Sequence, residues 1–247
     1  MVNLKPERLD AGEFNEQPLS ICGKVFIADS SGGLYWPAEQ ALIVAGLQLQ
    51  KGAPRDPHDT LTKLAEAIDR TNAATVICLG DGLHGPGSSP DSGPDTSPDT
   101  SIGAGAALMD SDDRDTLRML QDEREWIWIT SAVVPDWAAE LGGHRIADVT
   151  VAGLTLRDAP RAAAVTNEIA GNLQPAARIS LNGHMIRRPC FVGNGRRLIL
   201  PAFGASTGGL NVLDRAFAPL FANGGQSVWM LGQEGLYPVA SRLLRED

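Results

Sequence analysis

The chain has 247 residues, of which 43% are hydrophobic and 21% are charged, a composition that suits one globular domain with a substantial core. Its formal net charge of −9 would repel a polyanion, so we expect no nucleic acid as a direct ligand. No apolar run approaches the roughly 20 residues that span a bilayer, and the polar segment 1–17 has no signal-peptide core, so we expect a cytoplasmic protein without a membrane span.

The first third of the chain predicts strands that alternate with a helix. Segments 24–29, 35–37 and 41–45 have the patterns of strands. Apolar residues at helical spacing predict a helix over 59–70, with Asp59 or Thr60 as its cap. The apolar run 74–79 is typical of a strand that is buried on both faces.

A low-complexity segment follows, from about residue 85 to 105. It repeats a Pro-Asp-Ser/Thr tripeptide three times, starting at Pro90, Pro94 and Pro98, and contains almost no apolar side chains. Because such a segment cannot offset the entropy of ordering, we expect a disordered loop inside a single domain that comprises residues 1–247.

The second half predicts a helix over 112–123, a strand over 126–130, many short strands and a late helix over 210–221. The short strands are expected at 146–151, 155–156, 176–180, 189–192, 197–200 and 228–231. This order favours an α/β fold in which two sheets pack together with helices outside.

Three cysteines lie far apart, at Cys22, Cys78 and Cys190, each in an apolar stretch. An odd number without close spacing predicts neither a disulfide framework nor a zinc knuckle. Each thiol is therefore expected to be a small buried hydrophobe.

Four stretches have the apolar strands and glycine turns that surround a metal site, but most of their ligand positions carry other residues. Segment 42–51 lies where Asp-x-His is expected, and 76–84 keeps Gly-Asp-x-x-His. Segment 126–135 lacks the expected Gly-Asn-His-Asp, and 170–178 lacks Gly-His-x-His. On these stretches, and on 33–37, 188–194 and 201–212, the chain resembles the calcineurin-like metallophosphoesterase superfamily and, within it, the bacterial ligase-associated DNA damage response endonuclease family, PdeM.

The resemblance implies a four-layer α/β/β/α sandwich of two mixed sheets, with the metal site in loops at the strand ends. It also assigns each ligand position to a residue of this chain. Asp81 corresponds to the bridging carboxylate, His84 to an outer-shell histidine, Gly46 and Gln48 to the first Asp-x-His, Ala132 and Val133 to an Asn-His pair, Asp158 to a later histidine, and Asn172 and Gln174 to the last two histidines.

These replacements predict that a two-metal centre does not form. Such centres require several carboxylate and imidazole ligands that converge on ions about 3.5–4 Å apart. Glycine, alanine and valine offer no donor atom, and the amides are weak neutral ligands that can hydrogen-bond each other. Asp81 remains, and Asp158 is the only compensating carboxylate, so we expect no bound cofactor or, at most, weakly bound Mn²⁺ or Mg²⁺.

Three functions remain open at this point. The first is a non-catalytic homologue that serves as a protein-binding or structural module, with a partner in DNA repair implied by the resemblance, whose members are associated with a DNA ligase and a helicase, or with a partner in an unrelated complex. The second is an active metal-dependent phosphodiesterase or endonuclease with a rearranged, single-metal site at Asp81, His84 and Asp158. The third is a pocket that holds a phosphorylated ligand through the glycine-rich loop 204–209 without hydrolysing it.

Overall fold

The computed structural model describes residues 17–49, 53, 55–80, 109–130, 141–162, 167–181, 183–205, 209–221 and 225–247. The low-complexity segment 85–105 lies outside these residues, as do Asp81, His84, Ala132 and Val133. No described helix is long and apolar enough to cross a membrane.

The first sheet contains seven strands that follow one another in sequence order. Its strands are β1 (Gln17–Ile21), β2 (Lys24–Ala28), β3 (Leu34–Trp36), β4 (Ala41–Ala45), β5 (Thr75–Leu79), β6 (Glu125–Ile129) and β7 (His144–Ile146), with the short 3₁₀ helix η1 (Pro37–Glu39) between β3 and β4. The pairs from β1 to β4 are antiparallel, and those from β4 to β7 are parallel. The sheet is therefore mixed, and its parallel half brings the carboxyl ends of β4, β5 and β6 to one edge.

The second sheet has eight strands in the order β15-β14-β12-β13-β10-β9-β8, with β11 paired to β12. Its strands are β8 (Asp148–Val151), β9 (Leu154–Arg157), β10 (Glu168–Ala170), β11 (Ala176–Leu181), β12 (His184–Gly193), β13 (Arg197–Ile199), β14 (Ser227–Leu231) and β15 (Leu236–Val239). Strands β9, β10 and β13 are parallel, and the other neighbours are antiparallel.

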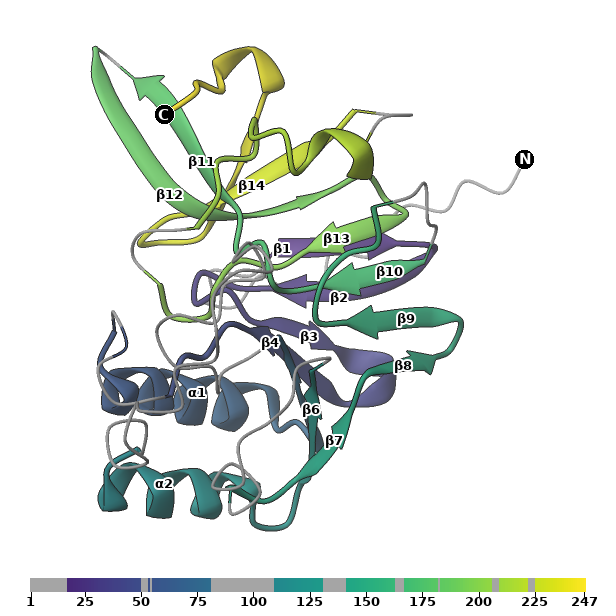
Figure 1. The fold of residues 1–247 in the computed structure, drawn as a ribbon, viewed down its shortest axis with the longest axis vertical. Coiled ribbons are helices and arrows are strands. Elements are labelled where there is room, and N and C mark those ends of the chain that lie inside the picture. Colours follow the sequence, from purple (N-terminus) through teal and green to yellow (C-terminus); the bar gives the residue numbers. More distant parts are fainter. Residues whose placement is uncertain are drawn as a thin grey trace, which may run out of the picture.

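Helices α1 (Pro57–Thr71) and α2 (Ser111–Gln121) pack together on the outer face of the first sheet (Figure 1). The N-cap of α1 is Asp56, whose carboxylate accepts the His58 N–H at 3.0 Å, so the expected cap at Asp59 or Thr60 is wrong. The expected helix nevertheless forms, because its apolar stripe packs against the sheet.

Strands β4 and β5 are buried on both faces, as their continuous apolar runs predict. Alternate residues point to opposite sides: Leu42 and Val44 pack against the helices, whereas Ile43 and Ala45 pack against the second sheet. The inter-sheet core also includes Leu156, Ile169, Phe191 and Leu198. This alternation determines which side chains of β4 and β5 face the second sheet.

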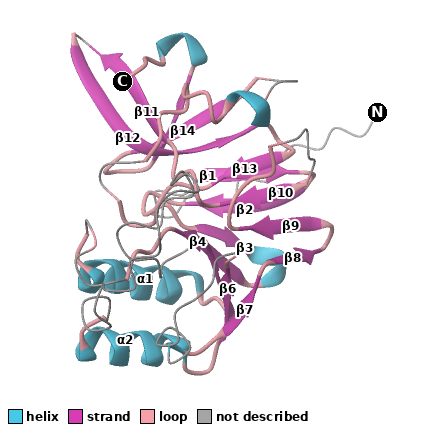
Figure 2. Cartoon of the chain, viewed as in Figure 1, coloured by secondary structure: helices cyan, strands magenta, loops and turns pink. Residues whose placement is uncertain are grey.

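The predicted sandwich of two mixed sheets is confirmed, and Figure 2 shows the helices α1 and α2 on the side of the first sheet. On the outer face of the second sheet, the described residues form turns and the short 3₁₀ helices η3 (Ala218–Leu220) and η4 (Ser241–Leu243). The expected helix over 210–221 is wrong. Side chains of Asn211 and Asp214 accept backbone N–H groups two residues onward, and such local bonds favour turns over helix.

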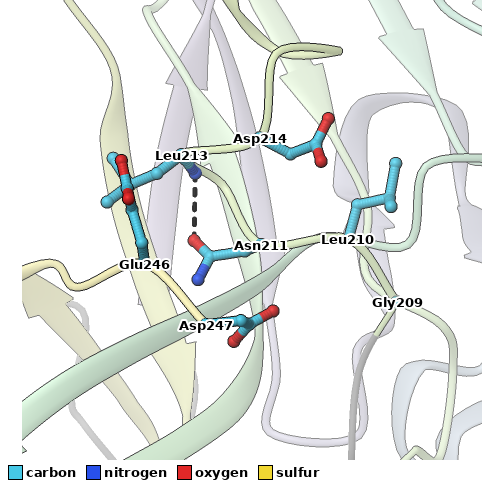
Figure 3. Close-up of a pocket in the computed structure, with 7 residues that line it drawn as sticks. All are labelled: Gly209, Leu210, Asn211, Leu213, Asp214, Glu246 and Asp247. Carbon is cyan, nitrogen blue, oxygen red and sulfur yellow. Dashed lines mark hydrogen bonds between the residues drawn. The ribbon is translucent and has the colours of Figure 1, made fainter.

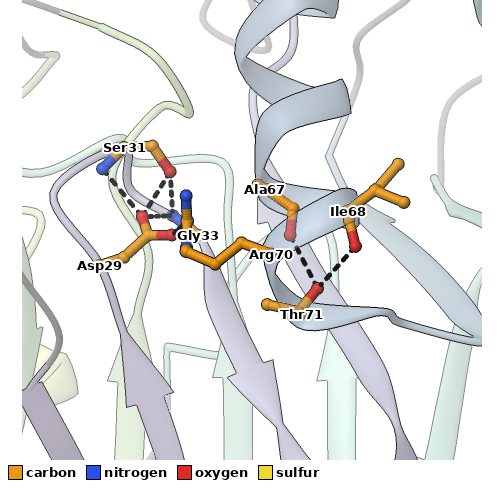
Figure 4. A network of polar contacts seen from close by, with 7 residues as sticks. All are labelled: Asp29, Ser31, Gly33, Ala67, Ile68, Arg70 and Thr71. Atoms are coloured by element: carbon orange, nitrogen blue, oxygen red, sulfur yellow. Dashed lines mark hydrogen bonds and ion pairs between the residues drawn. The ribbon is translucent and has the colours of Figure 1, made fainter. Parts of the chain in front are cut away.

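A polar network ties the carboxyl end of α1 to the turn after β2 (Figure 4). The Asp29 carboxylate accepts the backbone N–H of Ser31 at 2.8 Å and of Gly33 at 3.2 Å, and it also binds the Arg70 guanidinium. The same turn offers the Ser31 carbonyl to the Gly204 N–H at 2.6 Å. One buried carboxylate thus holds α1, this turn and the loop at Gly204 together.

We expect Asp29→Ala to lower the free energy of unfolding by about 1–3 kcal/mol, because it leaves buried donors without their acceptor. Urea denaturation of the full chain measures the loss. The matched control is Asp115→Ala, since the Asp115–Arg118 pair lies on the exposed side of α2 and should contribute less than about 1 kcal/mol. Equal losses in the two variants would contradict the role assigned to Asp29.

Candidate functional site

The candidate site lies where the carboxyl ends of strands from both sheets meet. Gly46 follows β4 and Gly80 follows β5, and both have positive φ angles, 57° and 76°. Their N–H groups donate to Leu79 and Ile129, at 3.3 and 3.1 Å, so the chain leaves the sheet in tight turns. Loops that leave parallel strands at one edge are common places for ligand sites.

Gly171 marks the closest approach of the second sheet to these ends. A Cβ on Gly171 would lie 2.9 Å from both the Cβ and the carbonyl oxygen of Leu79, and 3.0 Å from the Cβ of Ala45. The Gly171 N–H donates to the Asp158 carbonyl at 2.9 Å, which couples the ends of β9 and β10. Only a glycine allows the two sheets to meet this closely at position 171.

Gln174 occupies the space beside Gly46. A Cβ on Gly46 would lie 2.7 Å from Nε2 of Gln174, so any larger side chain at position 46 would displace this amide. Nε2 of Gln48 donates a long hydrogen bond of 3.5 Å to Oε1 of Gln174. Gly46, Gln48 and Gln174, three of the residues that the resemblance assigns to ligand positions, therefore lie together. The amides of Gln48 and Gln174 contact each other, as their chemistry predicts.

Asp158 and Asn172 form a second group around Gly80. Asp158 is buried, and its Oδ1 lies 2.9 Å from the point that a Gly80 Cβ would occupy. Its carbonyl accepts the Asn172 N–H at 2.9 Å, and the Asn172 nitrogen lies 3.8 Å from the same point. Asp81 directly follows Gly80 in the sequence, so the Asp158 carboxylate lies beside the residue that precedes Asp81.

Five of the nine positions expected from the sequence are thus described, and they form two adjacent groups at the strand ends. The other four, Asp81, His84, Ala132 and Val133, lie outside the described residues. Within the part of the chain that the structure describes, no three His, Cys, Asp or Glu side chains are close enough to share a metal ion. The five described positions hold three neutral amides, a glycine and one carboxylate, which do not fit a two-metal centre that requires several anionic or imidazole ligands.

Two cationic side chains that the motifs do not mark also lie at the site. Arg55 Nη2 donates to the Gly46 carbonyl at 2.7 Å, and its Nη1 donates to the Phe203 carbonyl. Lys63 Nζ, on α1, donates to the Gly204 carbonyl at 3.2 Å. No sequence pattern marks Arg55 or Lys63, because most of their partners are backbone carbonyls far along the chain, and such contacts leave no motif.

The cysteines provide no nucleophile among the buried strands. Burial raises the pKa of the Cys78 and Cys190 thiols well above the usual range, so both remain protonated. Cys22 is partly exposed, and its Sγ lies 2.8 Å from Oδ1 of Asn167. The expectation that the thiols are buried hydrophobes is confirmed for Cys78 and Cys190.

A separate cavity of about 280 Å³ lies in the outer layer of the second sheet (Figure 3). It is lined by Gly209, Leu210, Asn211, Leu213, Asp214, Glu246 and Asp247. Its wall is braced by a 3.0 Å ion pair from Arg187, which lowers the pKa of the Asp247 carboxyl below its usual value. The lining is acidic and contains no paired acid, base and nucleophile, so it offers no catalytic arrangement.

Comparison with known proteins gives a match at the level of structure. No protein-family model matches the chain, and no curated protein matches it. The crystal structure of the nuclease MPE from Pseudomonas putida is similar, with a TM-score of 0.65 and 21% sequence identity. The match covers 91% of this chain and 100% of that chain. At this level of identity it shows the metallophosphoesterase fold, and the arrangement of the two sheets follows that fold over nearly the whole length.

We expect Gly171→Ala to lower the free energy of unfolding by about 2–3 kcal/mol, because the new Cβ would force the two sheets apart at their strand ends. Chemical denaturation measures the loss. Gly33→Ala is the matched control: a Cβ there meets its nearest neighbours at 3.4 Å, an ordinary contact, and neither glycine has a positive φ angle. The control should lose no more than about 0.5 kcal/mol. Similar losses for the two variants would mean that the sheets do not meet tightly at Gly171.

Proposed function

We propose that the protein is a non-catalytic member of the metallophosphoesterase fold that serves as a protein-binding or structural module. The observation that carries this proposal is the contact at Gly46, where the amide of Gln174 lies 2.7 Å from the position of a Cβ. The position that the resemblance assigns to the first metal-binding aspartate thus has no side chain, and a glutamine fills the adjacent space.

The pattern of replacement supports the loss of catalysis rather than general decay. By the resemblance, Gln48 and Gln174 replace imidazoles with amides that share one long hydrogen bond, whereas single ligands left without a metal would be unpaired polar groups in a buried site. Meanwhile the strands that lead into the site, β4 and β5, retain fully buried apolar side chains on both faces. Random loss would damage this core as readily as the site.

A protein partner suits the chain better than a nucleic acid. The net charge of −9 opposes binding to a polyanion, because affinity for nucleic acids comes largely from lysine and arginine at phosphates. The resemblance to a ligase-associated family favours a partner from DNA repair, although a different complex fits the same surface charge.

The alternative is a metal-dependent phosphodiesterase of the DNA-repair type, with one weakly bound Mn²⁺ or Mg²⁺ held by Asp81 and Asp158. The observation in its favour is the position of the buried Asp158 carboxylate, 2.9 Å from the Cβ position of the residue that precedes Asp81. The similar structure from Pseudomonas putida is that of a nuclease.

The test is the metal content of the full chain after dialysis against Mn²⁺, measured together with hydrolysis of a bis-aryl phosphodiester. The proposal predicts near-zero bound metal and no hydrolysis above the rate in buffer. One or more retained ions, with activity that disappears in both Asp81→Asn and Asp158→Asn, would establish the alternative. Asp115→Asn is the control carboxylate, since Asp115 is exposed on α2 and should leave any metal binding unchanged.

A further inference from the structure

Arg55 and Lys63 are two neighbouring cations that no carboxylate neutralises among the described residues. Within the described part of the chain, their hydrogen bonds go to backbone carbonyls, of Gly46 and Phe203 for Arg55 and of Gly204 for Lys63. By contrast, Arg70 and Arg157 are each paired with an aspartate.

The two cations converge on one point above Gly204. The position of a Gly204 Cβ lies 3.4 Å from Nη1 of Arg55 and 4.0 Å from Nζ of Lys63. Gly204 has a φ angle of 69°, which favours glycine, so this residue places no side chain beside the two charged groups, and Cδ of Lys63 lies 3.3 Å from the same point. The two nitrogens are therefore near enough for a single tetrahedral oxyanion to contact both.

This point is held in place by the fold. The Gly204 N–H donates to Ser31, whose turn is fixed by the Asp29 carboxylate, and Phe203 is fully buried against α1. Arg55 is half-buried, and desolvation by burial lowers its pKa. A guanidinium has five N–H donors and an ammonium has three, so both groups keep donors for a ligand.

We infer that Arg55 and Lys63 bind the phosphate group of a small phosphorylated ligand at the strand-end site, without a metal ion. Charge-assisted hydrogen bonds from a guanidinium fork and an ammonium match the oxygens of a phosphate monoester. The inference rests on the proposed function, because it assigns the cationic role of the lost metal centre to side chains. Arg55 and Gln174 both contact Gly46, Arg55 through its carbonyl and Gln174 beside its Cβ position.

Isothermal titration calorimetry with the full chain, at low salt and in EDTA, tests the inference with inorganic phosphate, AMP and adenosine. We expect saturable binding of phosphate and AMP and none of adenosine. Equal affinities for phosphate and AMP would show that the site reads the phosphate alone, and tighter binding of AMP would identify a nucleotide. Binding of adenosine as tight as that of AMP would overturn the inference.

Lys63→Gln is the decisive variant, since Lys63 is exposed and its replacement should not affect folding. We expect affinity for phosphate to fall about tenfold or more, the effect of losing one charge-assisted hydrogen bond. Arg55→Lys, which keeps the charge and loses the planar fork, should also weaken binding. Arg188→Gln removes an exposed charge from β12, in the other sheet, and should leave the affinity unchanged.

The outcomes separate this inference from the proposed function. If phosphate does not bind in EDTA, or if Arg188→Gln weakens binding as much as Lys63→Gln, the phosphate site is wrong while the non-catalytic proposal stands. If phosphate binds only after Mn²⁺ is added and Lys63→Gln has no effect, both are wrong, because a metal centre then supplies the positive charge.

Discussion

The close contact between the two sheets at Gly171 is the constraint on which the site depends. Because this residue has no Cβ, the end of β10 can press directly against the ends of β4 and β5. The chain then turns back, and Gln174 donates its N–H to the Gly171 carbonyl at 3.1 Å and accepts the Gly209 N–H at 2.9 Å. This backbone anchoring places the Gln174 side chain beside Gly46, so the fold itself determines what fills the space next to this glycine.

The second sheet supports this contact with a buried ionic network. Glu168 and Arg197 are both fully buried, and Nε of Arg197 lies 2.7 Å from a Glu168 carboxylate oxygen. Arg157 binds the other oxygen at 3.5 Å, and its own partner Asp148 at 2.7 Å. A buried ion pair offsets its desolvation only when it is well bonded, and Arg197 also donates to the Leu220 and Arg161 carbonyls. These buried charges are therefore neutralised within the sheet, whereas Arg55 and Lys63 donate to backbone carbonyls.

The sequence allows the framework to be predicted better than the site. The strands at 41–45, 74–79 and 126–130 and both α-helices follow from apolar periodicity, because burial on one or both faces dictates their patterns. The helix expected over 210–221 does not form. Its apolar residues instead lie in turns and a short 3₁₀ helix that pack on the second sheet, and their spacing alone does not distinguish this arrangement from an α-helix. Motif positions indicated that Gly46, Gln48 and Gln174 belong together. The roles of Gly171 and Arg55 depend on contacts between distant segments, which no local pattern encodes.

A crystal soaked in Mn²⁺, with anomalous diffraction recorded to locate the ion, tests the central claim most directly. The account predicts no anomalous peak between the turns at Gly46 and Gly80 and the loops that carry Asp158 and Gln174, with the Gln174 amide still beside Gly46. A peak at that position, coordinated by Asp158 and Asp81, would contradict it and would establish a surviving metal centre.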